Sequence, residues 1–428
     1  MSTSQIDIST SVSLNTQAIL LLTAPLITGR GENSRELLSA SEYAKLARFL
    51  YNKDCQPADL VAARASDLLL ESGKIVNSDR LKRLVDRGFL LSQAIERWQA
   101  RAIWVVSRSD ECYPARLKER LKDSAPPVLY GCGNSAILNS GGLAVVGSRH
   151  ADPTVLESAT RIGELAARAQ RTIVSGGARG IDQAAMSGVL EAGGTAAGVL
   201  ADSLERAALN RDHRNYLRDN QLVLLSPYDP QAGFNIGNAM QRNKLIYALA
   251  DAALVVQADY GKGGTWAGAL EQLERLRLVP VYIPPNTQQD AAFQSLGKKG
   301  ALTWTNPTTP EEFIDVLAAR RSLSETEQLS FSAENGNQPD KILDEQKPIN
   351  TSGEADSSTI SPDEQLFATV RTLLGQLDAP KTDKEIADEL KIKSAQAREW
   401  IKRLVKEGTL QKLSKPTRYC STKNSKLF

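Results

Sequence analysis

The sequence has few of the residues on which catalytic and metal sites most often depend. Its 428 residues include two histidines, His150 and His213, and four cysteines that are scattered without a C-x-x-C pair. The histidines leave little for imidazole-based acid–base chemistry or metal binding. The cysteines argue against a disulfide framework and a structural zinc site, and they fit a reducing compartment. We therefore expect no metal site and a cytoplasmic location.

Long apolar runs are also lacking. No run reaches the ~18 residues of a membrane span, and "AILLLTAPLI" near the start is short and interrupted by Pro25. The polar start "MSTSQIDISTS" has no basic segment of the kind that opens a secretory signal. We expect neither a membrane partner nor secretion.

Positive and negative charges nearly balance over the whole sequence, but they are unevenly distributed along it. The formal net charge is +2, which does not by itself indicate nucleic-acid binding. Residues 322–361 hold eight acidic and two basic residues, a net charge of −6. Residues 378–428 hold thirteen basic and seven acidic residues, a net charge of +6. An acidic strip thus precedes a basic domain.

The hydrophobic pattern predicts an α/β fold with added domains. Residues 1–100 show apolar positions at helical spacing and predict an N-terminal helical domain. Residues 101–320 hold six short apolar runs that mostly alternate with helix-like segments, which predicts a Rossmann-like, doubly wound parallel sheet. The runs are "LAVVGS", "RTIVSG", "GTAAGVL", "QLVLLS", "AALVVQA" and "VPVYIP".

Beyond the sheet we predict a linker and a second small domain. Residues 321–361 are polar, acidic and almost free of aromatics, which predicts a disordered linker. Residues 362–428 read as three helices and a strand–turn–strand, "LQKLSKPTRYCST", which together predict a winged helix. Its candidate DNA contacts are Arg398, Lys402, Arg403, Lys412, Lys415 and Arg418. Docking of a protein partner is the other reading of this domain.

Glycine and arginine follow the first two predicted strands. Ser148 and Arg149 follow the first, and Ser175, Gly176, Gly177, Arg179 and Gly180 follow the second. Such glycines let a backbone approach an anion, and the next helix start can donate N–H groups to it. Asp182 is a candidate to cap that helix or to fix the loop. A glycine role in tight turns alone is the other reading.

The same loops exclude two familiar nucleotide sites. A G-x-G-x-x-G fingerprint is missing after the first strand, and no acidic residue ends the second. The segment "GKGGTWAG" has the wrong order for a G-x-x-x-x-G-K-[ST] phosphate loop. We expect no bound cofactor.

Two later strand ends add charge to the same edge of the sheet. The segment "QRNK" places Arg242, Asn243 and Lys244 at a predicted helix start, and another loop holds Lys262, Gly263, Gly264 and Thr265. With Arg149 and Arg179, these residues predict one basic crevice for a polymer of phosphates. Tyr260 or Trp266 is a candidate for stacking on a base. For Trp266 the other reading is a packed helix residue.

These motifs resemble the DNA-processing protein A (DprA/Smf) family. The resemblance rests on "AVVGSR", "IVSGGARGIDQAA", "QRNKLIYALAD" and "LVVQA", and it runs from about residue 100 to 285. It implies a Rossmann-like core that binds single-stranded DNA, a homodimer, and recruitment of a RecA-type recombinase in natural transformation. The implied DNA contacts are Ser148, Arg149, Ser175, Gly176, Gly177, Arg179, Gly180, Arg242, Asn243 and Lys244. We also expect no enzymatic activity.

Several positions depart from the family pattern and keep two alternatives open. Ala185-Met186 replaces an Ala-His pair, Lys244 replaces an arginine, and Gln257 replaces a glutamate. One alternative is a DNA- or nucleotide-sensing control subunit that restrains a toxin or effector in a defence or toxin–antitoxin module. The other is a nucleotide-processing phosphoribohydrolase-like enzyme with Glu271 as its catalytic residue. Contact with duplex DNA through the winged helix also stays open.

Overall fold

A computed structural model describes residues 12–27, 36–62, 65–285 and 290–318, with individual residues between 371 and 421. Its contacts divide the chain into two units, 1–337 and 338–428, and each is described by itself. In the described parts, no helix combines the length and apolar character needed to cross a membrane. The predicted linker 321–361 lies outside the described residues, and the predicted domain boundaries stay predictions.

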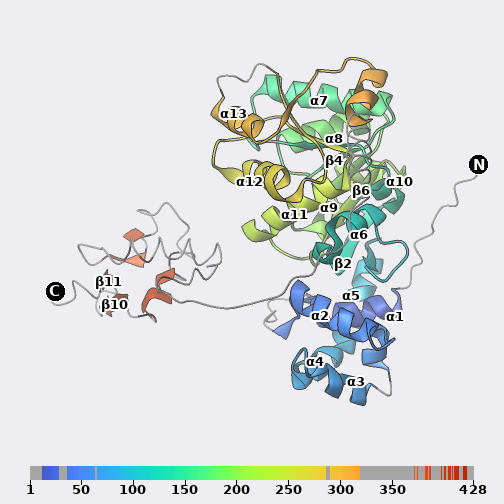
Figure 1. The fold of residues 1–428 in the computed structure, drawn as a ribbon, viewed down its shortest axis with the longest axis vertical. Coiled ribbons are helices and arrows are strands. Elements are labelled where there is room, and N and C mark those ends of the chain that lie inside the picture. Colours follow the sequence, from blue (N-terminus) through green and yellow to red (C-terminus); the bar gives the residue numbers. More distant parts are fainter. Residues whose placement is uncertain are drawn as a thin grey trace, which may run out of the picture. The chain divides into compact units, whose positions relative to one another are not determined.

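The described strands of the first unit form one nine-stranded sheet (Figure 1). Its spatial order is β1-β2-β6-β5-β4-β3-β7-β8-β9. The strands are β1 (Trp104–Ser107), β2 (Val128–Gly133), β3 (Leu143–Val146), β4 (Ile173–Ser175), β5 (Ala196–Val199), β6 (Leu222–Ser226), β7 (Ala252–Val255), β8 (Val281–Ile283) and β9 (Leu302–Thr303). The strands β3 to β8 are the six predicted apolar runs, and they pair in parallel as predicted. The edge strands β1 and β2 are antiparallel.

Alternation along the strands builds two apolar layers, one on each face of the sheet. Leu143 and Val145 of β3 belong to one core cluster, and Ala144 and Val146 belong to another, because successive side chains of a strand point to opposite faces. The first face is covered by α7 (Pro153–Arg168) and α8 (Ile181–Glu191), which lie side by side (Figure 1). The second is covered by α6 (Ala115–Leu121), α11 (Ile236–Leu249), α12 (Gly263–Glu271) and α13 (Ala291–Lys298). The doubly wound arrangement is thereby confirmed.

Four further helical segments belong to the described part of this region. A π-helical turn, Gln272–Leu276, extends α12, and residues 310–318 are helical. Two short helices, α9 (Leu204–Ala208) and α10 (Arg211–Arg218), connect β5 to β6. The sequence pattern did not predict α9 and α10, because their few apolar residues leave no clear helical stripe.

The N-terminal helices pack on the same core as the first face of the sheet. They are α1 (Leu14–Thr23), α2 (Ala40–Tyr51), the 3-10 helix Pro57–Val61, α3 (Ser66–Ser72), α4 (Ser78–Val85) and α5 (Gly88–Gln99). Leu20 and Leu22 of α1 share a cluster with Tyr130 of β2. The ring of Trp98 in α5 meets Tyr130 edge-on at 5.1 Å between ring centres. These helices therefore hold one edge of the sheet.

The second unit contains an antiparallel strand pair in the predicted strand–turn–strand. Strands β10 (Leu410–Leu413) and β11 (Arg418–Ser421) pair, and Lys381 forms a bridge with Tyr419. A small apolar cluster includes Leu374, Ile386, Ala397, Ile401, Leu404 and Leu410. The complete winged helix stays a prediction.

The predicted contacts of the winged helix are only partly described. Lys412 and Arg418 lie in the two paired strands. Arg403 forms an ion pair with Glu407 at 3.0 Å. The remaining three, Arg398, Lys402 and Lys415, lie outside the described residues.

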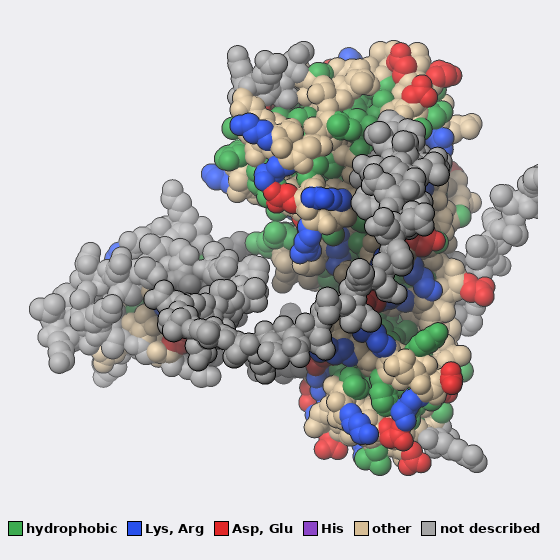
Figure 2. Space-filling model, viewed as in Figure 1, with side chains coloured by type: hydrophobic (Ala, Val, Ile, Leu, Met, Phe, Trp, Pro, Cys, Tyr) green, Lys and Arg blue, Asp and Glu red, His purple; other side chains and the backbone are tan. Residues whose placement is uncertain are grey.

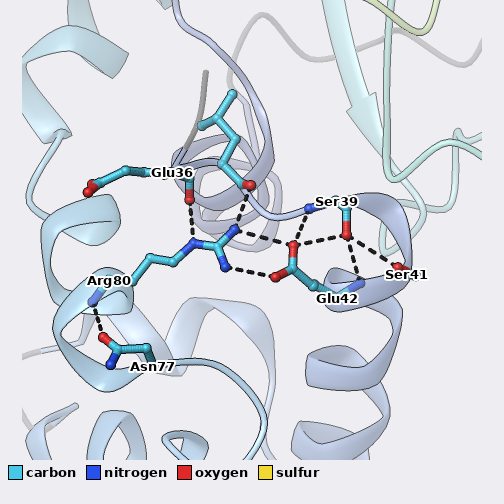
Figure 3. Close-up of polar contacts among 7 residues, drawn as sticks. Glu36, Ser39, Ser41, Glu42, Asn77 and Arg80 are labelled. Atoms are coloured by element: carbon cyan, nitrogen blue, oxygen red, sulfur yellow. Dashed lines mark hydrogen bonds and ion pairs between the residues drawn. The ribbon is translucent and has the colours of Figure 1, made fainter. Parts of the chain in front are cut away.

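Arg80 ties α4 to the start of α2 (Figure 3). Its Nε donates to the carbonyl oxygen of Glu36 and its Nη2 to that of Leu37, both at 2.7 Å, while Nη1 lies 2.7 Å from Oε1 of Glu42. Glu42 also accepts a hydrogen bond from the N–H of Ser39 (2.8 Å), which completes a capping box at the start of α2. The hydrogen bond from Arg80 is the main cause that lowers the pKa of Glu42 to about 2.

We expect Arg80→Ala to lower the free energy of unfolding by about 1–3 kcal/mol, because two carbonyls and a carboxylate lose their donor. The matched control is Arg83→Ala. Arg83 pairs with Glu36 at 3.0 Å, but its side chain is 57% exposed, so its loss should cost less than about 1 kcal/mol. Chemical denaturation followed by circular dichroism measures both. Equal losses in the two variants would contradict this role for Arg80.

Candidate nucleic-acid interface

The carboxylate of Asp182 holds the first two strand-end loops together. Its Oδ1 accepts a hydrogen bond from the N–H of Gly147 (3.2 Å), which follows β3, and its Oδ2 accepts one from Gly176 (3.1 Å), which follows β4. Asp182 is 6% exposed. Burial raises its pKa to about 6, against the opposing effects of Arg242 and the backbone donors. The carboxylate is therefore charged at neutral pH, and the predicted role of fixing the loop is confirmed.

Two glycines let these loops pack against neighbouring atoms. A Cβ atom on Gly176 would lie 2.2 Å from Nη1 of Arg242. A Cβ atom on Gly180, whose φ is +90°, would lie 2.4 Å from the carbonyl oxygen of Ser148. Protein atoms thus fill the space beside both glycines, which favours a structural role for these two glycines. Gly177, by contrast, is exposed and has a φ of +65°.

A cleft of about 1390 Å³ lies where the loops after β3, β4, β5 and β6 meet. Neighbouring parallel strands bring their carboxyl ends to one edge, so these loops share one side of the sheet. The acidic side chains in the lining are Asp202 and Glu205, and Glu205 is paired with Arg101 at 2.5 Å. The exposed cations of the lining are Arg149, Arg179, Arg206 and Arg211.

Sequence reasoning found two of these four arginines and missed Arg206 and Arg211. Both missed residues lie between β5 and β6, where α9 and α10 were not predicted. A usable signal was present, because basic residues here follow the buried strand "GTAAGVL" just as Arg149 follows β3. Both histidines, His150 and His213, also belong to the lining.

The "QRNK" segment does not act as one cationic group. We predicted it at a helix start, which is wrong: α11 begins at Ile236, so the segment lies inside the helix. Consecutive residues of a helix point in directions about 100° apart. Buried Arg242 donates to the carbonyl oxygen of Val199 and lines the cleft from below.

The next two residues of α11 face elsewhere. Asn243 donates from Nδ2 to the carbonyl oxygen of Gly264 at 3.0 Å. Lys244 is half-buried, and burial lowers its pKa against the opposing charge of Glu271. Neither residue lines the cleft.

The first turn of α12 supports the loop after β3. Thr265 Oγ1 donates to the carbonyl oxygen of Gly147 at 3.0 Å. Exposed Lys262 lies outside the lining of the cleft. Gly263 begins α12, and it too lies outside the lining. The predicted crevice of four cations therefore contains Arg149, Arg179 and Arg242 but not Lys262.

Two serines and a tryptophan also have structural contacts. Ser175 is fully buried and donates from Oγ to the carbonyl oxygen of Val145 at 2.6 Å. Ser148 Oγ accepts a hydrogen bond from the N–H of His150 at 3.2 Å. Trp266 is a packed core residue, in edge contact with Tyr260 at 5.0 Å, which matches its structural reading. Tyr260 itself is exposed.

Charged side chains are unevenly distributed over one face of the first unit. Figure 2 shows one face, on which Lys and Arg gather mostly across the middle of this unit, while Asp and Glu lie mostly toward its ends. A concentrated positive surface attracts polyanions more strongly than the same charges spread evenly.

A comparison with protein-family models identifies the central part of the chain. The model of DNA recombination-mediator protein A matches residues 104–315. Residues 104–315 belong to the DNA recombination-mediator protein A family. This family is the DprA/Smf family that the sequence motifs resemble, and the match covers β1 to β9 with every strand-end loop of the cleft.

Named relatives agree with this assignment. DNA processing protein DprA of Streptococcus pneumoniae is 30% identical over 175 residues, which are 40% of this chain and 61% of that protein. Protein Smf of Synechocystis is 31% identical over 172 residues, 39% of this chain and 42% of that protein. The chain thus spans about two-fifths to three-fifths of the length of these curated relatives.

The fold also agrees with a solved structure of the family. The X-ray structure of DNA processing protein A from Streptococcus pneumoniae aligns with a TM-score of 0.54 and 21% identity. The alignment covers 71% of this chain and 98% of that one. At this identity the likeness shows a common fold.

We expect Gly176→Ala to lower the free energy of unfolding by about 1–3 kcal/mol, because the added methyl group would displace the Arg242 guanidinium from its place beside Asp182. Gly88→Ala is the control, since nothing lies within 4 Å of a Cβ atom at this first residue of α5. It should change stability by less than about 1 kcal/mol. Denaturation curves of both variants test the difference, and an unaffected Gly176→Ala variant would refute the packing role.

Proposed function

We propose that this chain binds single-stranded DNA in the cleft at the carboxyl ends of β3 to β6. One observation carries the proposal: exposed arginines from three separate strand-end segments line one continuous space. These are Arg149 after β3, Arg179 after β4, and Arg206 with Arg211 after β5. Separate cations along one space suit successive phosphates of a polymer. The family to which residues 104–315 belong supports the same ligand class.

The size and charge of the cleft support an extended anionic ligand. Pockets for small molecules usually enclose ~300–1,000 Å³, whereas this cleft has a volume of about 1390 Å³. Phosphate contacts by arginine release counterions, so such binding is strong at low salt and weakens as salt rises. We infer binding that depends mainly on the phosphate backbone and little on base sequence.

Within this proposal the predicted site residues have different roles. Arg149 and Arg179 contact phosphates, together with Arg206 and Arg211, and the exposed Gly177 lets the DNA backbone approach. Buried Ser175 and Arg242 support the loops from below. The remaining predicted residues hold neighbouring loops: Ser148, Gly176, Gly180, Asn243, Lys244, Gly263, Gly264 and Thr265. Lys262 contacts only DNA that extends beyond the cleft.

The wider setting is part of the same proposal. The relatives are named DNA processing proteins, which supports a role in DNA recombination or natural transformation beside a RecA-type recombinase. We propose a cytoplasmic homodimer without enzymatic activity. The basic C-terminal region, net +6 over residues 378–428, would supply a second contact with DNA or a partner protein.

Two other readings of the chain receive less support. For a phosphoribohydrolase, Glu271 would have to be available to substrate, but it forms an ion pair with Arg275 on its own helix and lies outside the cleft. A control subunit of a toxin or defence module would use the same cleft. Co-purification with a protein other than a recombinase would favour that role.

We expect Arg149→Ala and Arg179→Ala each to weaken binding of single-stranded oligonucleotides about tenfold at low salt, because each removes one charge-assisted phosphate contact. The loss should be the same for oligonucleotides of different sequence. The slope of log affinity against log salt should fall by about 0.7 per contact. Fluorescence anisotropy at several salt concentrations measures both quantities.

Arg168→Ala is the matched control for these two variants. Arg168 is an exposed arginine at the end of α7 and lies outside the lining of the cleft. The Arg168→Ala substitution removes the same charge as the other two and should leave DNA affinity and its salt dependence almost unchanged. If all three variants bound alike, the proposed site would be wrong.

A further inference from the structure

Phe234 is an exposed aromatic ring in the lining of the basic cleft. Its side chain is 56% exposed, although phenylalanine is usually buried. Large exposed apolar residues are few in the described residues 101–318, and two of the six, Leu209 and Phe234, line the cleft. The six are Leu209, Phe234, Ile236, Met240, Tyr260 and Leu302. Exposed apolar side chains inside a cationic cleft indicate a ligand with both apolar and anionic parts.

The segment that carries Phe234 is firmly anchored on both sides. Asn235 caps α11 by accepting a hydrogen bond from the N–H of Asn238 (3.1 Å). The preceding residues 229–232 accept hydrogen bonds from other elements of the unit. These run from Ser203 N to Ala232 O (2.9 Å), from Glu205 N to Pro230 O (3.0 Å) and from Ile27 N to Asp229 Oδ2 (3.1 Å). The ring is therefore held in the open by a fixed backbone.

A cation lies over this ring. The guanidinium carbon of Arg149, from the loop after β3, is 5.5 Å from the centre of the Phe234 ring. Arginine beside an exposed ring offers one group for a phosphate and one for the flat face of a base. The two groups come from loops far apart in the sequence, and the fold brings them together on one wall of the cleft.

We propose that Phe234 stacks on an unpaired nucleobase while Arg149 holds a neighbouring phosphate, so that Phe234 makes the cleft selective for single-stranded DNA. The inference rests on the proposed DNA-binding function. In a duplex both faces of each base are covered by the neighbouring pairs, so the ring of Phe234 has no base face to contact. Because every base has such a face, stacking adds affinity without strong sequence preference.

The test separates bases from phosphates. Affinities of the full chain are measured for oligothymidylate and for an abasic oligomer with the same number of phosphates. We expect the unmodified chain to prefer oligothymidylate about tenfold, in keeping with one stacked base. Phe234→Leu keeps an apolar side chain but removes the ring face. This variant should bind both oligomers with the affinity that the unmodified chain has for the abasic oligomer. Its salt dependence should be unchanged, since no phosphate contact is lost.

Two further variants sharpen the result. Phe234→Trp keeps a ring and should retain the preference for oligothymidylate. Ile236→Ala removes an exposed apolar side chain that lies outside the lining of the cleft, and it should also retain the preference. Both variants also report on folding, because a damaged loop would weaken binding of the abasic oligomer as well.

The outcomes distinguish this inference from the function on which it rests. A Phe234→Leu variant that still prefers oligothymidylate about tenfold would overturn the stacking role and leave the DNA-binding proposal intact. An unmodified chain that bound both oligomers equally would also overturn it. An unmodified chain that bound neither oligomer would overturn both proposals.

Discussion

The site depends on one buried carboxylate shared between two loops. Asp182 accepts hydrogen bonds from the backbone after β3 and after β4, and so it fixes the position of Arg149 relative to Arg179. The cost of burying this charge is offset by backbone donors and by the charge of Arg242, which lies beside Gly176. The motif "SGGARGID" therefore serves first to join two strand ends, and the cleft follows from that junction.

The topology of the sheet determines where the other cations lie. Four neighbouring parallel strands end at one edge of the sheet, so short polar loops from distant parts of the sequence meet there without long insertions. The N-terminal helices reinforce this edge. Glu205 of α9, in the lining, pairs with Arg101 just after α5, and Asp229 accepts a hydrogen bond from Ile27 just after α1. The N-terminal helices thus help to shape the cleft.

Much of the fold was predictable, because the six runs of Val, Ile, Leu and Ala that form β3 to β8 have few other stable arrangements. The direction of single side chains was not. "QRNK" reads as four cationic or polar neighbours, yet helical geometry points Arg242 into the interior and Lys244 toward Glu271. Arg206, Arg211 and Phe234 were missed because they lie in segments with no apolar periodicity. They lie near Arg149 only because of long-range contacts in the fold, which a local sequence pattern cannot predict.

The central claim is that the arginines around the cleft, and not those elsewhere on the first unit, meet the DNA. Chemical modification of arginine by phenylglyoxal, mapped by mass spectrometry with and without oligothymidylate, tests it directly. We expect the oligonucleotide to protect Arg149, Arg179, Arg206 and Arg211, while Arg168 on α7 stays reactive. Protection of Arg168 with continued reactivity of the four cleft arginines would contradict it.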